Sequence, residues 1–396
     1  MVMTTEEVGR KVLQQLNEAG YEAYFVGGMV RDALLGHEIY DADITTSATP
    51  DEVLALFEKT IATGLQHGTV TVVMDENNIE VTTFRLDGNY LDNRHPEHVT
   101  FTQSLSADLS RRDFTINAMA QALDGTIHDP FCGQADLEAK IIRAVGNPVQ
   151  RFEEDALRIL RGIRFVAKLG FEIEKKTLEA MKACHQLLAS LSLERIRKEF
   201  EGIIEGEYRL KALKMMRNHE LFSHIPYFKS FSHLSDSELE RLDDFTLAVI
   251  IMEACCKRSD ESFAKFPLKK SEKKLIREID TVFLNFDDVG EARDMLTQYY
   301  FGAETLRMIK KFENCADCTR HADETFSPFS LAIESRNEIR IQPEEVLRLS
   351  GNAPGAWVNK LFTEIEKAII FGEVENNSET LMTFIKERGI FDVKET

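Results

Sequence analysis

Hydrophobic residues change their spacing once along this chain of 396 residues. Up to about residue 146, short runs such as 24–26 and 79–85 alternate with turn residues, which is typical of strands joined to short helices. Beyond that point apolar residues recur at helical spacing. The predicted helices lie at 152–169, 175–189, 193–205, 208–219, 240–256, 271–283, 290–299, 302–313, 343–350 and 354–372. Asn147-Pro148 separates the two regions, so the pattern predicts an α+β protein with an α/β head, built on a mixed sheet, followed by an all-α part.

A glycine pair follows the first apolar run. The residues at 24–26 predict a short buried strand, and Gly27 and Gly28 then allow a tight turn whose amides can approach a phosphate closely. A helix opening at 30–35 would place its positive end beside the same anion. Paired glycines are most often turns alone, so the phosphate-binding interpretation depends on the residues that come after the helix.

Two carboxylates come shortly after this helix. Asp41 and Asp43 are spaced i, i+2, so on a strand both side chains leave the same face and can share divalent cations. Glu80, in the second strand-like run, is a third candidate ligand, with a polar edge-strand residue as the alternative. Such oxygens suit Mg²⁺, which can activate an attacking hydroxyl and stabilise a leaving pyrophosphate. The layout predicts a nucleotidyl-transfer site with Asp41 and Asp43 as catalytic and metal-binding residues.

Six segments of the chain match the motifs of a known family. They are 27–43, 109–119 (with the run Arg-Arg-Asp-Phe-Thr-Ile-Asn), 129–146, 152–161, 193–196 and, more loosely, 351–358. In these segments the chain resembles the class II tRNA nucleotidyltransferases. This family of the DNA polymerase beta superfamily includes CCA-adding enzymes and bacterial poly(A) polymerases. The strong similarity covers the first half of the chain.

The resemblance implies a domain order and an activity. It implies a DNA polymerase beta-like head at 1–147, a nucleotide-selecting neck at 148–206, and a helical body at 207–320 and tail at 321–396 that bind tRNA. The implied reaction is template-independent addition of C, C and A to the 3′ end of tRNA from CTP and ATP, with Mg²⁺, by two-metal in-line transfer that releases pyrophosphate. The alternatives are a poly(A) polymerase of the same family and a catalytically decayed RNA-binding protein.

The segment 152–161 also has a physical interpretation. Glu154, Arg158 and Arg161 fall at i, i+4 and i+7 of one predicted helix, with Asp155 three residues before Arg158. Cytosine and adenine present an amino donor beside an unprotonated ring nitrogen, whereas uracil and guanine present a carbonyl beside a ring N–H. An Asp acceptor beside an Arg donor distinguishes the two pairs. In isolation the same spacing is typical of an exposed helix with ion pairs.

The matching motif at 109–119 adds further candidate contacts. Arg111 and Arg112 are planar cations suited to a triphosphate or ribose contact, and Asp113 is expected to orient one of them. Asn117 resembles the family residue near the nucleotide. The predicted nucleotide-binding set is Gly28, Arg31, Arg112, Asn117, Glu154, Asp155, Arg158 and Arg161.

A polar, turn-rich loop lies between residues 85 and 101 and carries Arg85, Asp92 and Arg94. In the family such a loop is associated with completing the terminal A addition. The resemblance therefore favours full CCA addition over addition of CC alone. A long hairpin connection without a catalytic part is the alternative.

A net charge of −19 would argue against a nucleic-acid partner if charge were spread evenly. Basic residues are clustered, however, and clusters can bind phosphate within an acidic surface. A solvated helix face is the alternative for each cluster. The predicted RNA-binding residues are Arg195, Arg197, Lys198, Lys269 and Lys270.

The remaining sequence features favour a cytoplasmic protein. No span is apolar enough to cross a membrane, and the first eleven residues resemble neither a signal nor a transit peptide. The six cysteines do not suggest a disulfide framework. Cys315, Cys318 and His321 have metal-like spacing, but a fourth zinc ligand is not evident. The sequence leaves the oligomeric state open, and a metal-dependent phosphohydrolase is a further alternative that no motif singles out.

Overall fold

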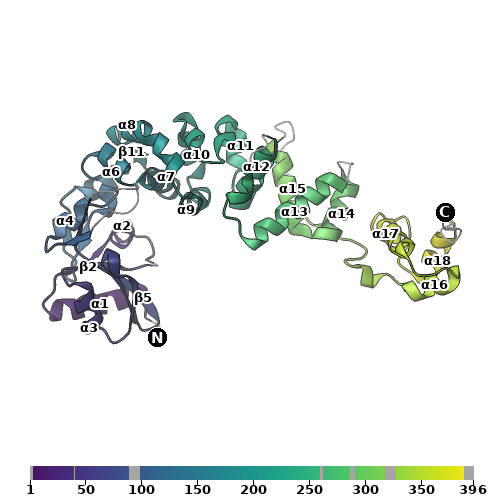
Figure 1. The fold of residues 1–396 in the computed structure, drawn as a ribbon, viewed down its shortest axis with the longest axis horizontal. Coiled ribbons are helices and arrows are strands. Elements are labelled where there is room, and N and C mark those ends of the chain that lie inside the picture. The colour runs from purple at the N-terminus through teal and green to yellow at the C-terminus, as the bar shows by residue number, and fades with distance from the viewer. Residues whose placement is uncertain are drawn as a thin grey trace. The chain divides into compact units, whose positions relative to one another are not determined.

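The computed structural model describes residues 3–39, 41–88, 99–258, 262–285, 290–316 and 327–387. It divides into two compact units. The first comprises Met1–Phe245 with Met252–Pro267, and the second comprises Thr246–Ile251 with Leu268–Thr396. Each unit is considered by itself, and Figure 1 labels the elements of both.

A seven-stranded sheet forms the head, in the strand order β3-β4-β5-β2-β1-β8-β9. Strands β2 and β5 are parallel, and every other pair in this sheet is antiparallel, so the predicted mixed sheet is confirmed. The strands are β1 (Ala23–Val26), β2 (Asp43–Thr46), β3 (Thr60–Gly64), β4 (Thr69–Met74), β5 (Asn77–Thr83), β8 (Ala120–Gln121) and β9 (Ile127–His128). Two small sheets pair β6 (Arg85–Asp87) with β7 (Val99–Phe101), and β10 (Ile141–Ile142) with β11 (Glu172–Ile173).

Helices accompany these strands in the head, at the purple and blue end of the chain in Figure 1. They are α1 (Thr5–Glu18), α2 (Gly28–Leu34), α3 (Pro50–Leu56), α4 (Leu105–Ser110) and α5 (Gly133–Glu138), with single 3₁₀ turns η1 (Leu65–His67) and η2 (Thr115–Asn117). Helix α1 begins with a capping box between Thr4 and Glu7 and buries Val12 and Leu16 against the sheet. The helix therefore has both a defined start and an apolar face.

Helices continue the first unit after Asn147, whose side chain accepts the amides of Val149 and Gln150 and so caps the next helix. The predicted single helix at 152–169 is wrong, because the chain leaves the helix at Asp155 and re-enters it at Leu157. The elements are α6 (Pro148–Glu154), α7 (Leu157–Leu169), α8 (Lys175–Cys184), η3 (His185–Ser190), α9 (Leu193–Ile204), α10 (Arg209–Asn218), η4 (Leu221–His224), η5 (Lys229–His233), α11 (Asp236–Arg241), α12 (Phe245–Arg258) and η6 (Phe263–Lys265).

The second unit contains helices and no strand in its described part, and it includes Thr246–Ile251 of α12. Its elements are α13 (Lys270–Asn285), α14 (Glu291–Phe301), α15 (Ala303–Ala316), η7 (Arg336–Glu338), α16 (Pro343–Ser350), α17 (Ala356–Ile370) and α18 (Ser378–Glu387). Leu361 and Ile365 of α17 belong to a buried cluster that also includes Leu296 of α14. Among the described residues, no helix has the length and apolarity that a bilayer crossing requires.

Candidate active site

The glycine turn forms as predicted, between β1 and α2. Gly27 has φ 70° and ψ −132°, a backbone conformation that L-residues rarely adopt, and α2 starts at Gly28. A Cβ built on Gly27 would lie 3.2 Å from Nη1 of Arg112 and 3.8 Å from Oδ2 of Asp43. The turn therefore needs glycine for its conformation, and the space beside it is shared by a cation and a carboxylate.

The parallel pairing of β2 with β5 brings Asp43 directly opposite Glu80. Asp41 lies two residues earlier, before β2 begins, and is exposed. Desolvation and then the carboxylates of Glu80 and Asp41 raise the pKa of Asp43, while Arg112 opposes them. Oxygen donors of this kind fit a hard divalent cation. No three His, Cys, Asp or Glu side chains in the described ranges already lie in an arrangement that could hold a metal ion.

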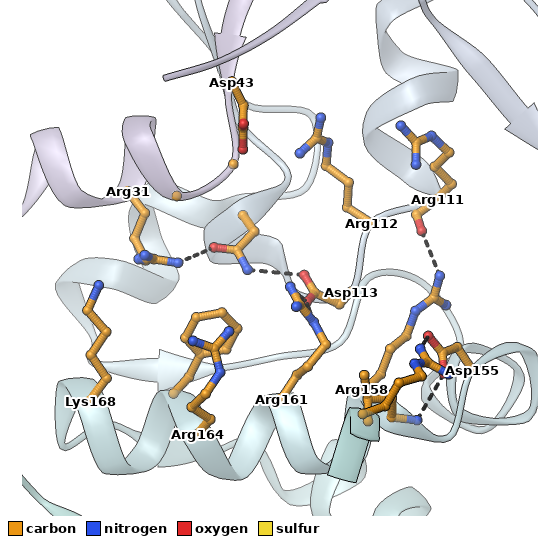
Figure 2. A pocket seen from close by; sticks show the side chains of 16 residues that line it. Arg31, Asp43, Arg111, Arg112, Asp113, Asp155, Arg158, Arg161, Arg164 and Lys168 are labelled. Atoms are coloured by element: carbon orange, nitrogen blue, oxygen red, sulfur yellow. Dashed lines mark hydrogen bonds and ion pairs between the residues drawn. The ribbon is translucent and has the colours of Figure 1, made fainter. Parts of the chain in front are cut away.

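A cavity of about 420 Å³ opens beside Asp43 (Figure 2). Eight Arg or Lys residues line it against three Asp residues, so its potential favours an anionic ligand. Figure 2 shows Asp43 and Arg112 on one side of the cavity, and Arg158, Arg161, Arg164 and Lys168 along α7 on the opposite side. The charged lining residues are Arg31, Asp43, Arg111, Arg112, Asp113, Asp155, Arg158, Arg161, Arg164, Lys168 and Arg195.

Arg112 contacts Asp108 but keeps an unused N–H donor. Its Nη2 is 3.4 Å from Oδ2 of Asp108, and its Nε is buried and finds no hydrogen-bond acceptor in the described part of the chain. Burial lowers the pKa of Arg112, and Asp108 acts against that effect. Asp108 also binds Arg111, at 2.8 Å. The described hydrogen bonds of Arg111 and Arg112 go to Asp108, and Asp113, which was expected to orient one of the two arginines, acts on Arg112 through its charge. A buried, unsatisfied Arg112 donor suits an anionic ligand.

Asp113 instead binds Arg161, with 2.7 Å between Oδ2 and Nε, and accepts Nδ2 of Asn117 at 3.1 Å. Burial alone would raise the pKa of Asp113, but Arg161, Asn117 and the amide of Phe114 outweigh it and lower the pKa to about 2. Asp113 thus stays ionised and joins the head to α7.

Arg31 extends this network. Its Nη1 is 2.6 Å from Oδ1 of Asn117, and it forms two hydrogen bonds with Asp32, which also accepts Nζ of Lys168 at 3.2 Å. These contacts form a chain of hydrogen bonds that starts at Arg161 and ends at Lys168, both on α7. We call it the polar ring, and its members are Arg161, Asp113, Asn117, Arg31, Asp32 and Lys168.

Phe165 lies beside two members of the polar ring, Arg31 and Arg161. The guanidinium carbons of Arg31, Arg164 and Arg161 lie 5.0, 5.4 and 6.0 Å from its ring centroid. Phe165, Arg164 and Lys168 line the cavity but were absent from the predicted set. Their spacing from Arg161, at i+3, i+4 and i+7, was the signal in the sequence that could have found them.

The break after α6 changes how Glu154, Asp155 and Arg158 meet. Arg158 is buried, and its Nη1 donates to Oε2 of Glu154 (2.7 Å) and to the carbonyl of Arg151 (3.0 Å), while its Nη2 donates to the carbonyl of Arg111 (3.1 Å). These contacts use three of the five N–H donors of a guanidinium, so Arg158 keeps capacity for a ligand.

Asp155 is held by two other groups. Its Oδ1 accepts the amide of Leu157 at 3.0 Å, and its Oδ2 accepts Nη2 of Arg195 at 2.7 Å. A carboxylate has about four acceptor positions, so Asp155 can accept from a ligand as well. Both Asp155 and Arg158 line the cavity that holds Asp43.

Some predicted residues lie elsewhere. Arg85 is on β6 and donates to the carbonyl of His67. Arg197 is 7% exposed, donates to the carbonyl of Pro267 and lies over Phe245, so its guanidinium is unavailable to RNA in this structure. Lys198, Lys269 and Lys270 are exposed. The loop residues Asp92 and Arg94, and the suggested zinc ligands Cys318 and His321, lie outside the described residues.

Three family models match the chain. The Poly A polymerase head domain matches residues 23–143, the Probable RNA and SrmB-binding site of polymerase A matches 170–232, and tRNA nucleotidyltransferase domain 2 matches 246–385. Members of this nucleotidyltransferase family generally use divalent metal ions.

Individual relatives match over nearly the whole chain. The CCA-adding enzyme of Geobacillus sp. (strain WCH70) is 38% identical in an alignment of 394 positions that covers 96% of either chain. The Bacillus stearothermophilus CCA-adding enzyme in complex with CTP is 32% identical, with a TM-score of 0.76 and 97% of each chain covered. The Thermotoga maritima CCA-adding enzyme complexed with tRNA shares the fold, at 21% identity, a TM-score of 0.65, and 96% and 95% coverage. The chain belongs to the CCA-adding enzymes, the class II tRNA nucleotidyltransferases.

Proposed function

We propose that this protein adds C, C and A in turn to the 3′ end of tRNA, using CTP and ATP and releasing pyrophosphate. One observation carries the proposal. The carboxylate of Asp43 and the base-reading candidates Asp155 and Arg158 line a single cationic cavity. A nucleoside triphosphate has its reacting phosphate and its base at opposite ends, so one bound molecule can reach both.

The head residues bind and orient the reacting groups. The amides at Gly28 and the free donor of Arg112 receive the triphosphate. The terminal 3′-hydroxyl oxygen of tRNA bonds to the α-phosphorus as the bond to pyrophosphate breaks, and the hydroxyl proton leaves to solvent. Asp41 and Asp43, with Glu80 as the third candidate, would hold Mg²⁺. When bound, Mg²⁺ lowers the hydroxyl pKa and neutralises charge on the phosphates.

The neck residues select the base. Asp155 accepts the amino group of cytosine or adenine, and Arg158 donates to the adjacent ring nitrogen. Uracil and guanine would place a carbonyl against the carboxylate and an N–H against the guanidinium. Unmatched buried polar groups are costly, which excludes UTP and GTP.

The partner is tRNA, which we assign to the helical residues 207–396, together with the exposed Lys198 on α9. Lys269 and Lys270 are exposed candidates within that range. The loop at 85–101 is assigned to the terminal A addition, and the cytoplasm is the proposed location. A poly(A) polymerase is the second candidate, because the head matches the model of that name.

The test is incorporation of each labelled nucleoside triphosphate, with Mg²⁺, into a tRNA transcript that lacks its 3′ CCA and into an unrelated RNA. We expect two C and one A on tRNA alone, followed by arrest. Asp43→Ala and Asp41→Ala should abolish incorporation, whereas Asp51→Ala, which removes an exposed carboxylate of α3, should not. Long A tails on either RNA would identify a poly(A) polymerase, and the absence of incorporation would support a decayed head.

A further inference from the structure

Asp155 and Arg158 have opposite charges three residues apart and line the same cavity, yet the described contacts of their side chains are with other groups. Only their backbones are joined in the described structure, where the Arg158 amide donates to the carbonyl of Asp155 at 3.0 Å. Glu154 and the carbonyls of Arg151 and Arg111 hold Arg158. The Leu157 amide and Arg195 hold Asp155. Opposite charges so close along the chain attract one another. The separate partners therefore keep the Asp155 carboxylate apart from the Arg158 guanidinium.

Arg195 is the charged partner on the acidic side. Its Nη2 lies 2.7 Å from Oδ2 of Asp155, and the two side chains are 20% and 17% exposed, which limits screening by salt. The Leu157 amide occupies the other oxygen of Asp155. One anchor on each oxygen fixes the rotation of the carboxylate as well as its position.

The position of Arg195 in its own helix is unfavourable. It is the third residue of α9, within the first turn, where free amides and the helix dipole disfavour a cation. Arg195 therefore does not stabilise the end of α9, and its contact with Asp155, forty residues earlier, accounts for its place.

We propose that Arg195 is the positioning residue that determines nucleotide specificity at Asp155. It keeps the carboxylate aimed at the amino group of the incoming base and keeps it from pairing with Arg158. The proposal rests on the proposed function and replaces the RNA-binding role predicted for Arg195. Without Arg195, one oxygen of Asp155 loses its partner and the carboxylate turns to Arg158, which removes the donor and acceptor pattern that excludes UTP.

The test uses the full chain with Arg195→Ala and Arg195→Lys. The control is Arg10→Ala, which removes an arginine paired with a carboxylate on α1, outside the cavity. The readouts are kcat/KM for CTP and for UTP on a tRNA transcript ending before the first C, the KM for tRNA, and the thermal midpoint. Equilibrium binding of CTP and UTP without tRNA is measured in the same variants.

We expect Arg195→Ala to lower kcat/KM for CTP by about 10- to 100-fold, the range for loss of a charged hydrogen bond, with a smaller change for UTP. The ratio of CTP to UTP therefore falls, in turnover and in binding. Arg195→Lys should restore part of the ratio, and Arg10→Ala should leave it unchanged.

Two results would overturn the proposal. A raised KM for tRNA with an unchanged ratio of kcat/KM for CTP to that for UTP would show that Arg195 binds RNA instead. An equal fall for all nucleotides with a lower thermal midpoint would show a structural role alone. Failure of the wild-type enzyme to extend tRNA would instead refute the proposed function, and the binding ratios would still decide the role of Arg195.

Discussion

Gly27→Ala and Gly28→Ala are the same chemical change at neighbouring positions, and we expect opposite effects on stability. Gly27 has a positive φ of 70°. Gly28 is the first residue of α2, and a Cβ there would meet Nη2 of Arg31 at 3.5 Å, an ordinary van der Waals contact. The substitution therefore strains the turn at position 27 and suits the helix at position 28.

The magnitudes come from these two environments. A non-glycine residue forced into such a backbone region costs about 1–3 kcal/mol. At position 27 the new Cβ would also lie 3.2 Å from Nη1 of Arg112, so Arg112 has to move away from Asp43. At position 28, alanine reduces the entropy of the unfolded chain and adds about 0.4–1 kcal/mol of stability. The two variants should differ by about 1.4–4 kcal/mol in the free energy of unfolding.

The assay is thermal unfolding of the N-terminal unit in both variants, followed by CTP incorporation for Gly27→Ala. For a unit of this size each kcal/mol shifts the midpoint by about 2–4 °C, so the midpoints should differ by roughly 3 °C or more. The displacement of Arg112 should also lower kcat/KM for CTP by at least about tenfold. Equal midpoints, or a lower midpoint for Gly28→Ala, would refute the assignment of strain to Gly27.

Three further predictions concern the metal site and the second unit. Asp43→Asn should lower nucleotide incorporation by about 1000-fold, since a bound metal contributes several kcal/mol. A filter assay should show that tRNA binding is retained, and unchanged incorporation would exclude the metal role of Asp43. Glu366→Gln should destabilise the C-terminal unit by about 1–3 kcal/mol, because this 2%-exposed carboxylate accepts from Tyr299, Tyr300 and Arg336, while water can solvate the half-exposed Arg336. CTP binding in calorimetry should not change. Burial and Glu366 raise the pKa of Tyr299 and Tyr300. As the pH rises past about 10, both tyrosines ionise in the unfolded chain but stay protonated in the folded one, so the C-terminal unit should lose stability above that pH. Tyrosinate absorbance during a pH titration of unfolding would measure this loss.

The local features of the site could be predicted because short stretches of sequence determine them. An apolar run, two glycines and a helical pattern predict the turn at Gly27 without information from the rest of the chain. The cap at Asn147 was predictable for the same reason. Helix α11 was also within reach, because Ser235 and Glu238 form a capping box that identifies its start.

The features that could not be predicted depend on contacts between distant segments. No glycine or proline marks the break at Asp155, where the chain leaves the helix and the carboxylate accepts the Leu157 amide and Arg195. Glu80 was a candidate ligand from its sequence, but the register that places it directly opposite Asp43 depends on how two strands pair across the sheet. The pairing of Asp113 with Arg161 likewise joins residues 48 positions apart.

The polar ring fixes the angle of α7 as well as its location. Arg161 and Lys168 are seven residues apart, so the two attachment points are separated by about 10 Å along the helix axis. A helix with one side-chain contact to the head can rotate about that contact, whereas two separated contacts also define its direction. The buried apolar face of α7 packs against α9 and α10, and the two end contacts add a defined orientation toward the head. Arg158, one turn before Arg161 on the same helix, shares that orientation, so loss of either end contact would leave its position relative to Asp43 less well defined.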